Sequence, residues 1–269
     1  MRQYYYEDAR WPWRADSILR RFLGKRKSEP QRHREHRAGI GRALDLGMGY
    51  GRNALWLAER GYEVEGWEQD RRYVAEARRE ARRRGVRLYC VERDFTHLPR
   101  RGRPAWPYDV IVVSLALHQV RRSAALRVLR WSCQALAPGG QLFLMVKLTR
   151  DRLFQRARRN PAWRPVPGER NTFLRPQRRR RGYFHPGRPR RPRMILSALE
   201  PAEVRAALRG FKVRHYREVV LRSEWEEPEG ACPELAERVT HHVAEVVAER
   251  AKTEKPFGYA QGKRKPKTG

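Results

Sequence analysis

The sequence predicts an α/β fold in which helices cover both faces of a doubly wound, mostly parallel β-sheet. Two stretches carry this prediction. Residues 42–70, RALDLGMGYGRNALWLAERGYEVEGWEQD, have the pattern of a strand, a glycine turn, a helix and a second strand. Residues 108–117, YDVIVVSLAL, form a nearly continuous apolar run with β-branched residues in its middle, which is typical of a parallel strand buried on both faces.

The first stretch is one βαβ half-unit. Residues 43–46 form a short, mostly apolar strand, and an amphipathic helix begins after the turn and stops at Gly61. Residues 62–67 can then form the next strand, which ends at Glu68. The turn itself contains three glycines at alternate positions: Gly47, Gly49 and Gly51.

Glycines in such a turn allow a nucleotide to lie directly on the backbone at a helix N-terminus. Glu68 stands about twenty residues further on, where a carboxylate can accept hydrogen bonds from ribose hydroxyls. The dinucleotide fingerprint G-x-G-x-x-G requires glycine at position 52, which is Arg52 here, whereas the third glycine is Gly51. The spacing therefore disfavours NAD.

The run D-L-G-x-G-x-G-R, followed by an acid at the end of the next strand, resembles motif I of the class I S-adenosylmethionine-dependent methyltransferases. The amino-acid sequence of this stretch is most similar to the branch of small-molecule enzymes that includes tellurite- and thiopurine-type methyltransferases. The resemblance implies that Asp45 holds the methionine amino end of the cofactor, that the three glycines lie beneath it, and that Glu68 binds the ribose. Gln69 departs from the pattern, because an apolar residue there usually packs on adenine.

Further residues follow the same pattern. Asp70 can cap the next helix, which stops at Gly85, and residues 86–91 can be the third strand. By the resemblance, the Asp94 carboxylate takes the adenine amino group and the backbone of Phe95 meets the adenine ring.

The strand at 108–117 belongs beside the first strand, so the crevice between the two is the switch point of the sheet and ligands meet their C-terminal ends. Ser114 and His118 therefore fall near the methyl donor. The run SLALHQV resembles the family's fourth motif, in which a histidine often follows the strand. His118 is the candidate catalytic residue, as a general base or as a group that orients the acceptor; a structural histidine is the alternative.

A helix with one apolar face then leads into the turn at residues 137–140 and the strand 141–148, and L-x-P-G-G-x-L resembles the usual entry to the fifth strand. Residues 151–193 show no convincing helix or strand and contain four consecutive arginines at 178–181. This segment is interpreted as a substrate lid or an RNA-facing loop, with a merely solvated loop as the alternative.

A last helix begins near Pro201 and stops at Gly210. Strands at 211–221 and 242–248 suit the reversed final hairpin of the resembling family. His241 and His242 have no partner at metal-ligand spacing in the sequence, so they are interpreted as structural. The complete prediction is a Rossmann-like, doubly wound, seven-stranded and mostly parallel sheet with a reversed C-terminal strand.

Three segments are expected. Residues 1–40 form a helical and aromatic cap segment, in which aromatic residues either cover the cofactor or anchor a helix to the core. Residues 41–251 form the methyltransferase domain, with the arginine-rich insertion at about 151–193. Residues 252–269 lose the apolar pattern and are expected to be disordered.

Composition narrows the functional classes. The chain has 269 residues, enough for one α/β domain, and a formal net charge of +31, which favours a polyanionic partner such as RNA unless the arginine excess reflects genomic base composition. The three cysteines, Cys90, Cys133 and Cys232, are too few and too far apart for a metal site or a disulfide framework. No apolar run is long enough to span a bilayer, so a cytoplasmic protein without a bound metal or a membrane contact is expected.

The sequence therefore predicts an S-adenosylmethionine-dependent methyltransferase that acts on a small-molecule acceptor. The alternatives are an RNA- or protein-directed methyltransferase and a non-catalytic adenosyl- or RNA-binding module of the same fold. No N-P-P-Y motif follows the fourth strand, which argues against methylation of base amino groups.

Overall fold

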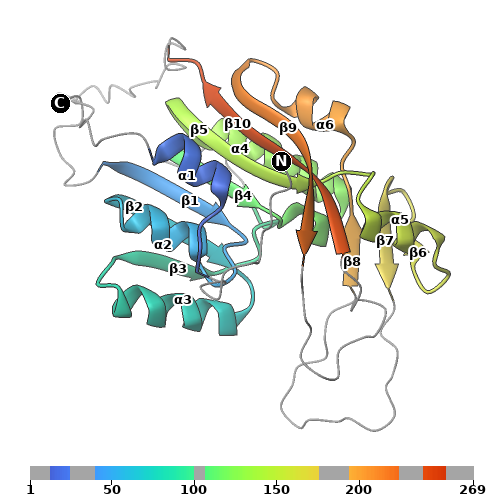
Figure 1. Ribbon diagram of the computed structural model, residues 1–269, viewed down its shortest axis with the longest axis horizontal. Coiled ribbons are helices and arrows are strands. Elements are labelled where there is room, and N and C mark those ends of the chain that lie inside the picture. The colour runs from blue at the N-terminus through green and yellow to red at the C-terminus, as the bar shows by residue number, and fades with distance from the viewer. Residues whose placement is uncertain (1–12, 25–39, 100–106, 176–193, 224–238, 253–269) are drawn as a thin grey trace, which may run out of the picture.

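A seven-stranded sheet forms the centre of the molecule (Figure 1). The computed structural model describes residues 13–24, 40–99, 107–175, 194–223 and 239–252. The strands of the central sheet are β1 (Gly41–Leu46), β2 (Tyr62–Glu68), β3 (Leu88–Glu92), β4 (Tyr108–Ser114), β5 (Leu136–Lys147), β9 (Phe211–Ser223) and β10 (Val239–Arg250).

The strand order is β3-β2-β1-β4-β5-β10-β9. The strands from β3 to β5 in this order are parallel, whereas β10 runs antiparallel to both β5 and β9. β1 pairs with β2 on one side and with β4 on the other. The strands before β4 are therefore added toward one edge of the sheet and β4 and β5 toward the other, so β1 and β4 flank the switch point. The predicted doubly wound, seven-stranded sheet with a reversed C-terminal strand is confirmed.

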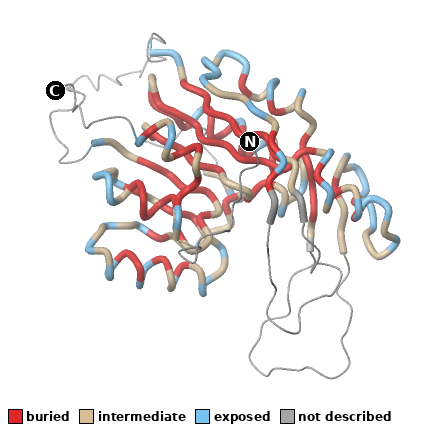
Figure 2. The backbone as a smooth tube through the Cα atoms, viewed as in Figure 1, coloured by how far each residue is buried: buried red, intermediate tan, exposed pale blue. Residues whose placement is uncertain are grey.

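Helices cover the sheet on both faces, as two separate core clusters show. On one face α1 (Ser17–Leu23) and α2 (Arg52–Ala58) pack on the sheet, and α3 (Arg71–Arg83) packs nearby beside β3. On the other face lie α4 (Arg122–Ala135) and α6 (Pro201–Ala207). Burial is therefore concentrated in the strands between the helices (Figure 2).

Alternation along β5 shows how one strand serves both clusters. Leu142 and Leu144 face α4 and α6, whereas Phe143 and Met145 face α1 and α2. Successive side chains of a strand point to opposite faces, so a strand buried on both faces must be apolar throughout. This is why the parallel strands could be recognised as continuous apolar runs.

Helix ends follow the predicted signals. Asp70 caps α3 by accepting a hydrogen bond from the backbone N–H of Arg72 at 2.9 Å. Gly61 and Gly85, at φ +82° and +66°, follow α2 and α3. Glu200 and Glu203 form a capping box around the start of α6.

The prediction that residues 151–193 contain no helix or strand is wrong for the part that the structure describes. This part forms α5 (Arg152–Arg159), β6 (Arg164–Pro165) and β7 (Thr172–Arg175), and β7 pairs with β8 (Met194–Ser197) in a small second sheet (Figure 1). The helix is short, and only Phe154 and Ala157 are buried in it, so its apolar periodicity spans a single turn. β7 depends on a partner strand that starts almost twenty residues later, which no local pattern reveals. The arginines at 178–181 lie outside the described residues.

Smaller differences concern element ends. β5 begins at Leu136, so it includes the predicted turn at 137–140. β4 ends at Ser114 instead of position 117, because Leu115 has φ +50° and a 3-10 turn, η1 (Leu117–Gln119), follows. Cys90 and Cys133 are buried free thiols, while Cys232 and nearly all of the predicted C-terminal tail lie outside the described residues. In the part of the chain that the structure describes, no helix combines the length and the apolar character needed to cross a membrane.

The centre of the sheet should limit stability. Leu44 of β1 is fully buried against α4 and its neighbours, so Leu44→Ala should lower the free energy of unfolding by about 2–5 kcal/mol through lost burial and a residual cavity. Urea denaturation measures this change. Val213→Ala on β9, where the side chain is 46% exposed, is the matched control and should shift the value by less than about 0.5 kcal/mol. Equal losses in the two variants would contradict the burial argument.

Candidate active site at the C-terminal edge of the sheet

The glycine turn joins β1 to α2. Its three glycines have φ angles of +68°, +56° and +85°, which side-chain-bearing residues rarely adopt. A Cβ on Gly47 would lie 2.7 Å from the Ala116 Cβ, so the turn is closed on that side. A Cβ on Gly49 would meet no heavy atom within 4 Å. The backbone at Gly49 is therefore bare on the side where a ligand can approach.

Glu68 ties the end of β2 to this turn. Its Oε2 accepts a hydrogen bond from the backbone N–H of Gly49 at 3.0 Å, and its Oε1 accepts one from Asp70 N–H at 2.9 Å. A carboxylate has about four acceptor sites, so each oxygen retains capacity for a further donor. The predicted ribose-binding acid is thus held within hydrogen-bond distance of the turn.

Asp45 lies beneath the turn at the end of β1 and is buried. Its Oδ2 has no hydrogen-bond partner among the described residues. Burial, followed by the negative charge of Asp16, raises the pKa of Asp45 to about 7, although the positive charge of Arg52 opposes the shift. An orphaned carboxylate oxygen at this place is suited to a cationic donor that the protein itself does not supply.

A polar network beside Asp45 was missed by the sequence reasoning. Asp16, at the start of α1, accepts a hydrogen bond from the Asn53 side chain at 2.8 Å and lies 2.7 Å from the Arg52 guanidinium. Asn53 in turn accepts from the Asp16 backbone N–H at 2.9 Å. These contacts anchor α1 to the start of α2 over 37 residues of sequence, and no local signal in the sequence pairs them.

The end of β3 also reaches the turn. Asp94 Oδ1 accepts hydrogen bonds from the backbone N–H and the hydroxyl of Thr96, at 2.8 and 2.7 Å. Phe95 is buried, and its ring lies 3.3 Å from the position of a Cβ on Gly47. Asp94 and Phe95 are therefore next to the glycines, as the sequence predicts, while their role toward an adenine ring stays a prediction. Gln69 is exposed.

Ser114 and His118 follow β4. The Ser114 hydroxyl accepts a hydrogen bond from the Arg52 guanidinium at 3.4 Å, which places it close to the turn. His118 lies in η1, and its Nδ1 is enclosed without a partner among the described residues. Burial, with the nearby charges of Lys147 and His241, lowers the pKa of His118 well below its ordinary value. The imidazole is therefore neutral at physiological pH.

Three more polar side chains lie at this edge of the sheet, and the charges of two of them, Lys147 and His241, act on His118. Lys147 is the last residue of β5, Asp151 caps α5, and His241 lies near the start of β10. Asp151 Oδ2 lies 3.1 Å from His241 Nδ1. The interpretation of His241 and His242 as structural stays a prediction; the structure adds their partners, since Asp151, 90 positions earlier, contacts His241, and Glu218 lies 3.4 Å from His242 Nε2.

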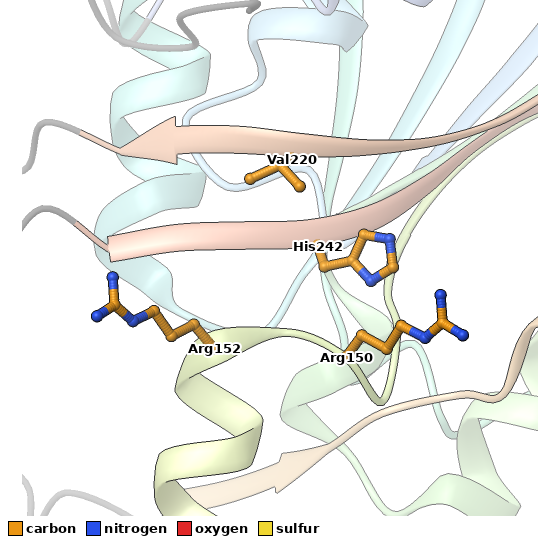
Figure 3. A pocket seen from close by; sticks show the side chains of 4 residues that line it. All are labelled: Arg150, Arg152, Val220 and His242. Carbon is orange, nitrogen blue, oxygen red and sulfur yellow. The ribbon is translucent and has the colours of Figure 1, made fainter.

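A hollow of about 320 Å³ lies at the same edge of the sheet, beyond β5 (Figure 3). Arg150, Arg152, Val220 and His242 line it. The two arginine side chains extend to opposite sides of the opening, and His242 lies between β10 and the loop that follows β5 (Figure 3). The hollow is basic and open.

The aromatic cap predicted for residues 1–40 is described only in part. Trp13 packs edge-on against Tyr50 of the glycine turn, with ring centroids 5.9 Å apart, and Tyr50 contacts Tyr73 of α3. The aromatic residues before position 13 lie outside the described residues. The lid role of this segment stays a prediction.

Comparisons with known proteins agree with this geometry. Residues 43–140 match the family described as methyltransferase domain. The matched range includes the glycine turn, Glu68, Asp94 and His118. No curated protein matches the chain in sequence.

Solved structures share the fold. A Methanosarcina mazei SAM-dependent methyltransferase aligns with a TM-score of 0.55 and 19% identity, covering 78% of this chain and 92% of its own. TehB from Haemophilus influenzae aligns with a TM-score of 0.52 and 17% identity, covering 78% of this chain and 57% of its own. A Burkholderia thailandensis 1,6-didemethyltoxoflavin-N1-methyltransferase, solved with bound 1,6-didemethyltoxoflavin and S-adenosylhomocysteine, aligns with a TM-score of 0.50 and 16% identity, covering 87% of this chain and 75% of its own.

Asp45 supplies a test of the site that needs no ligand. Its pKa is raised from 3.8 to about 7 in the folded state, so the folded protein binds the proton more tightly than the unfolded chain and loses stability as pH rises through this range. Asp45→Asn cannot ionise and should be more stable than the wild type, with a gain about 2 kcal/mol larger at pH 8 than at pH 5.5. Urea unfolding at both pH values measures it.

Glu92→Gln, at an exposed carboxylate paired with Arg71, is the control and should show no such pH-dependent gain. A destabilised Asp45→Asn variant at pH 8 would mean that Asp45 has a compensating partner in the folded protein.

Proposed function

We propose that this chain, a member of the class I methyltransferases by its domain at residues 43–140 and by its fold, binds S-adenosylmethionine and transfers its methyl group to a small-molecule acceptor. The observation that carries the proposal is the orphaned Oδ2 of buried Asp45 beneath the bare backbone of Gly49. A ligand that lies on the turn and directs an ammonium group downward supplies the partner that Asp45 lacks.

The residues present fit this cofactor. Asp45 would take the amino group of the methionine moiety, and Glu68 would take the ribose hydroxyls with the acceptor capacity that its two backbone hydrogen bonds leave. Asp94 and Phe95, at the end of β3, would border the adenine, and Ser114 at the end of β4 would face the methionine end. Asp16 and Asn53 hold Arg52 in place beside these groups.

When bound, the sulfonium supplies a methyl carbon that is already electrophilic. The task of the protein is therefore to hold the acceptor atom in line with the carbon–sulfur bond and to exclude water. His118 follows β4 on the acceptor side, and its imidazole is neutral because burial lowers its pKa. We assign to His118 the role of a hydrogen-bonding group that orients the acceptor.

A small acceptor is supported by the enclosed position of His118 Nδ1 and by the fold shared with the Burkholderia 1,6-didemethyltoxoflavin-N1-methyltransferase. The net charge of +31 favours RNA instead. Arginines in the described helices are, however, partly neutralised locally: Arg83 and Arg84 both pair with Glu80 in α3. We therefore favour the small acceptor.

Cofactor binding can be separated from folding with two glycines. Gly49 (φ +56°) and Gly85 (φ +66°) have similar backbone conformations, and a Cβ on either meets no atom within 4 Å. Gly49→Ala and Gly85→Ala should therefore lose similar stability, about 1 kcal/mol each. Only Gly49→Ala places a methyl group where the cofactor lies, so only this variant should weaken S-adenosylhomocysteine binding, by at least about tenfold.

Isothermal calorimetry measures both affinities, and thermal unfolding measures both stabilities. Equal affinity in the two variants, or binding of NAD in place of S-adenosylhomocysteine, would remove the cofactor assignment.

The acceptor class is tested by transfer of a labelled methyl group from S-adenosylmethionine to a panel of small thiols, phenols, oxyanions and amines, and in parallel to total cellular RNA. Transfer to a small acceptor should change little between 50 and 200 mM salt, whereas binding through several phosphates would fall by about 10³-fold or more over that range. Robust, salt-sensitive labelling of RNA with no small acceptor would show that the substrate is nucleic acid.

A further inference from the structure

Four polar side chains, His118 among them, come from four elements that the fold brings to one edge of the sheet. Lys147 ends β5, His118 lies in η1 after β4, Asp151 caps α5 and His241 lies near the start of β10. Lys147 pairs directly with Val243, so Lys147, Val243 and His241 lie on the same face of the sheet. This is the face that α1 and α2 cover, where Phe143, Met145 and Val243 belong to one core cluster.

Asp151 is held in place by hydrogen bonds in this cluster. Its side chain is fully buried, and it accepts hydrogen bonds from the backbone N–H of Phe154 and of His242, both at 3.1 Å. Its Oδ2 also contacts His241 Nδ1 at 3.1 Å. Burial opposes ionisation, but the contact with His241 and the positive charges of Lys147 and His241 bring the pKa of Asp151 below its ordinary value. Asp151 is therefore an anion that fixes α5, β10 and the His241 ring.

Lys147, by contrast, has no close partner among the described residues. Its side chain is 5% exposed, and among the described residues no carboxylate lies within 4 Å of it and no group accepts a hydrogen bond from it. A buried ammonium without a close partner is energetically unfavourable, so burial lowers the pKa of Lys147, and the negative charge of Asp151 at longer range opposes the shift only in part. Glu245, on the same face of β10, lies beside His215 at 3.8 Å instead.

We propose that Lys147 is the general base of the reaction and that the acceptor is a weak acid, a phenol or thiol whose X–H group points at Lys147 Nζ. The inference rests on the proposed function, because it assigns a role within the same site. His118 is the neighbouring group that orients the acceptor, and Asp151 and His241 are positioning residues.

Lys147 is preferred over His118 as the general base because burial moves the pKa values of the two groups to different places relative to neutral pH. A general base works best when its pKa lies near the operating pH. Burial moves the pKa of a lysine downward, toward neutrality, whereas it moves the pKa of His118 further below neutrality and makes the imidazole a poor proton acceptor. Asp151 then stabilises the ammonium that forms.

The step balances in atoms and charge. The acceptor proton goes to Lys147 Nζ, the electron pair of the X–H bond becomes available on X, and X forms the new bond to the methyl carbon. The carbon–sulfur bond breaks with its electron pair remaining on sulfur, which becomes a neutral thioether. One positive charge is lost from the sulfonium and one appears on Lys147, which later releases its proton to water.

The test replaces Lys147 by methionine, which fills similar space without charge and should leave the fold intact, since burying an apolar group in place of a lone charge is seldom destabilising. Lys212→Met, at an exposed position of β9, is the matched control. The acceptors are 4-methoxyphenol, which is protonated at neutral pH, and 2,4-dinitrophenol, which is ionised. For Lys147→Met, kcat on 4-methoxyphenol should fall about 10²- to 10⁴-fold, while kcat on 2,4-dinitrophenol falls less than about tenfold.

A spectroscopic readout requires no turnover. In the complex of wild-type protein with S-adenosylhomocysteine, bound 4-nitrophenol should absorb as phenolate at a pH at least about one unit lower than free 4-nitrophenol, because Lys147 accepts its proton. This shift should vanish in Lys147→Met and persist in Lys212→Met. In the wild type the rate on 4-methoxyphenol should rise with pH and level off below the ordinary pKa of lysine, and in the variant the rise should move to the pKa of the acceptor.

The outcomes separate the two proposals. Failure of wild-type protein to bind S-adenosylhomocysteine removes the proposed function. Normal binding with equal rate losses on both phenols, or an unshifted 4-nitrophenol spectrum in the wild type, shows that Lys147 is structural and overturns only this inference. Normal binding with neither methylation nor binding of any phenol or thiol overturns the acceptor class.

Discussion

The parallel pairing of β1 with β2 on one side and β4 on the other is the constraint on which the site depends. Parallel strands end at one edge of a sheet, so Asp45, Glu68 and Ser114, in the last two residues of β1, β2 and β4, are brought to a common edge although they are far apart in the sequence. The glycine turn closes over this edge, and the hydrogen bond from Gly49 N–H to Glu68 holds it there. The reversed β10 extends the same edge and brings His241 to the end of β5.

Two ionisable groups at this edge are held under unfavourable conditions. Asp45 lies beneath the turn with an unpaired oxygen among the described residues, and Lys147 ends β5 without a close counter-ion among them. A charge that is buried without a partner destabilises the folded protein, and its pKa moves toward the neutral form. A buried group of this kind is retained when a ligand provides its missing partner. Without the ligand, the protein is less stable than it would be with an apolar residue at the same position. The two groups lie on either side of the place where the cofactor and acceptor are proposed to meet.

Two other buried carboxylates at this edge do have partners, which makes the contrast informative. Asp151 accepts two backbone N–H groups and contacts His241, and Asp16 contacts both Arg52 and Asn53. These carboxylates fix the relative positions of α1, α2, α5 and β10. Paired carboxylates thus position elements at the same sheet edge where Asp45 and Lys147 are proposed to meet ligands.

The sequence by itself determined the fold class, the central strands and the predicted cofactor side of the site. Continuous apolar runs mark parallel strands because both faces are buried, and the glycines with Glu68 lie within one local unit whose spacing sets its geometry. Only the tertiary structure decided the acceptor side. The pairing of β7 with β8 and the contact of Asp151 with His241 join residues separated by some 20 to 90 positions. Short polar segments carry no periodicity, so nothing in their local sequence indicates which distant strand end they will meet.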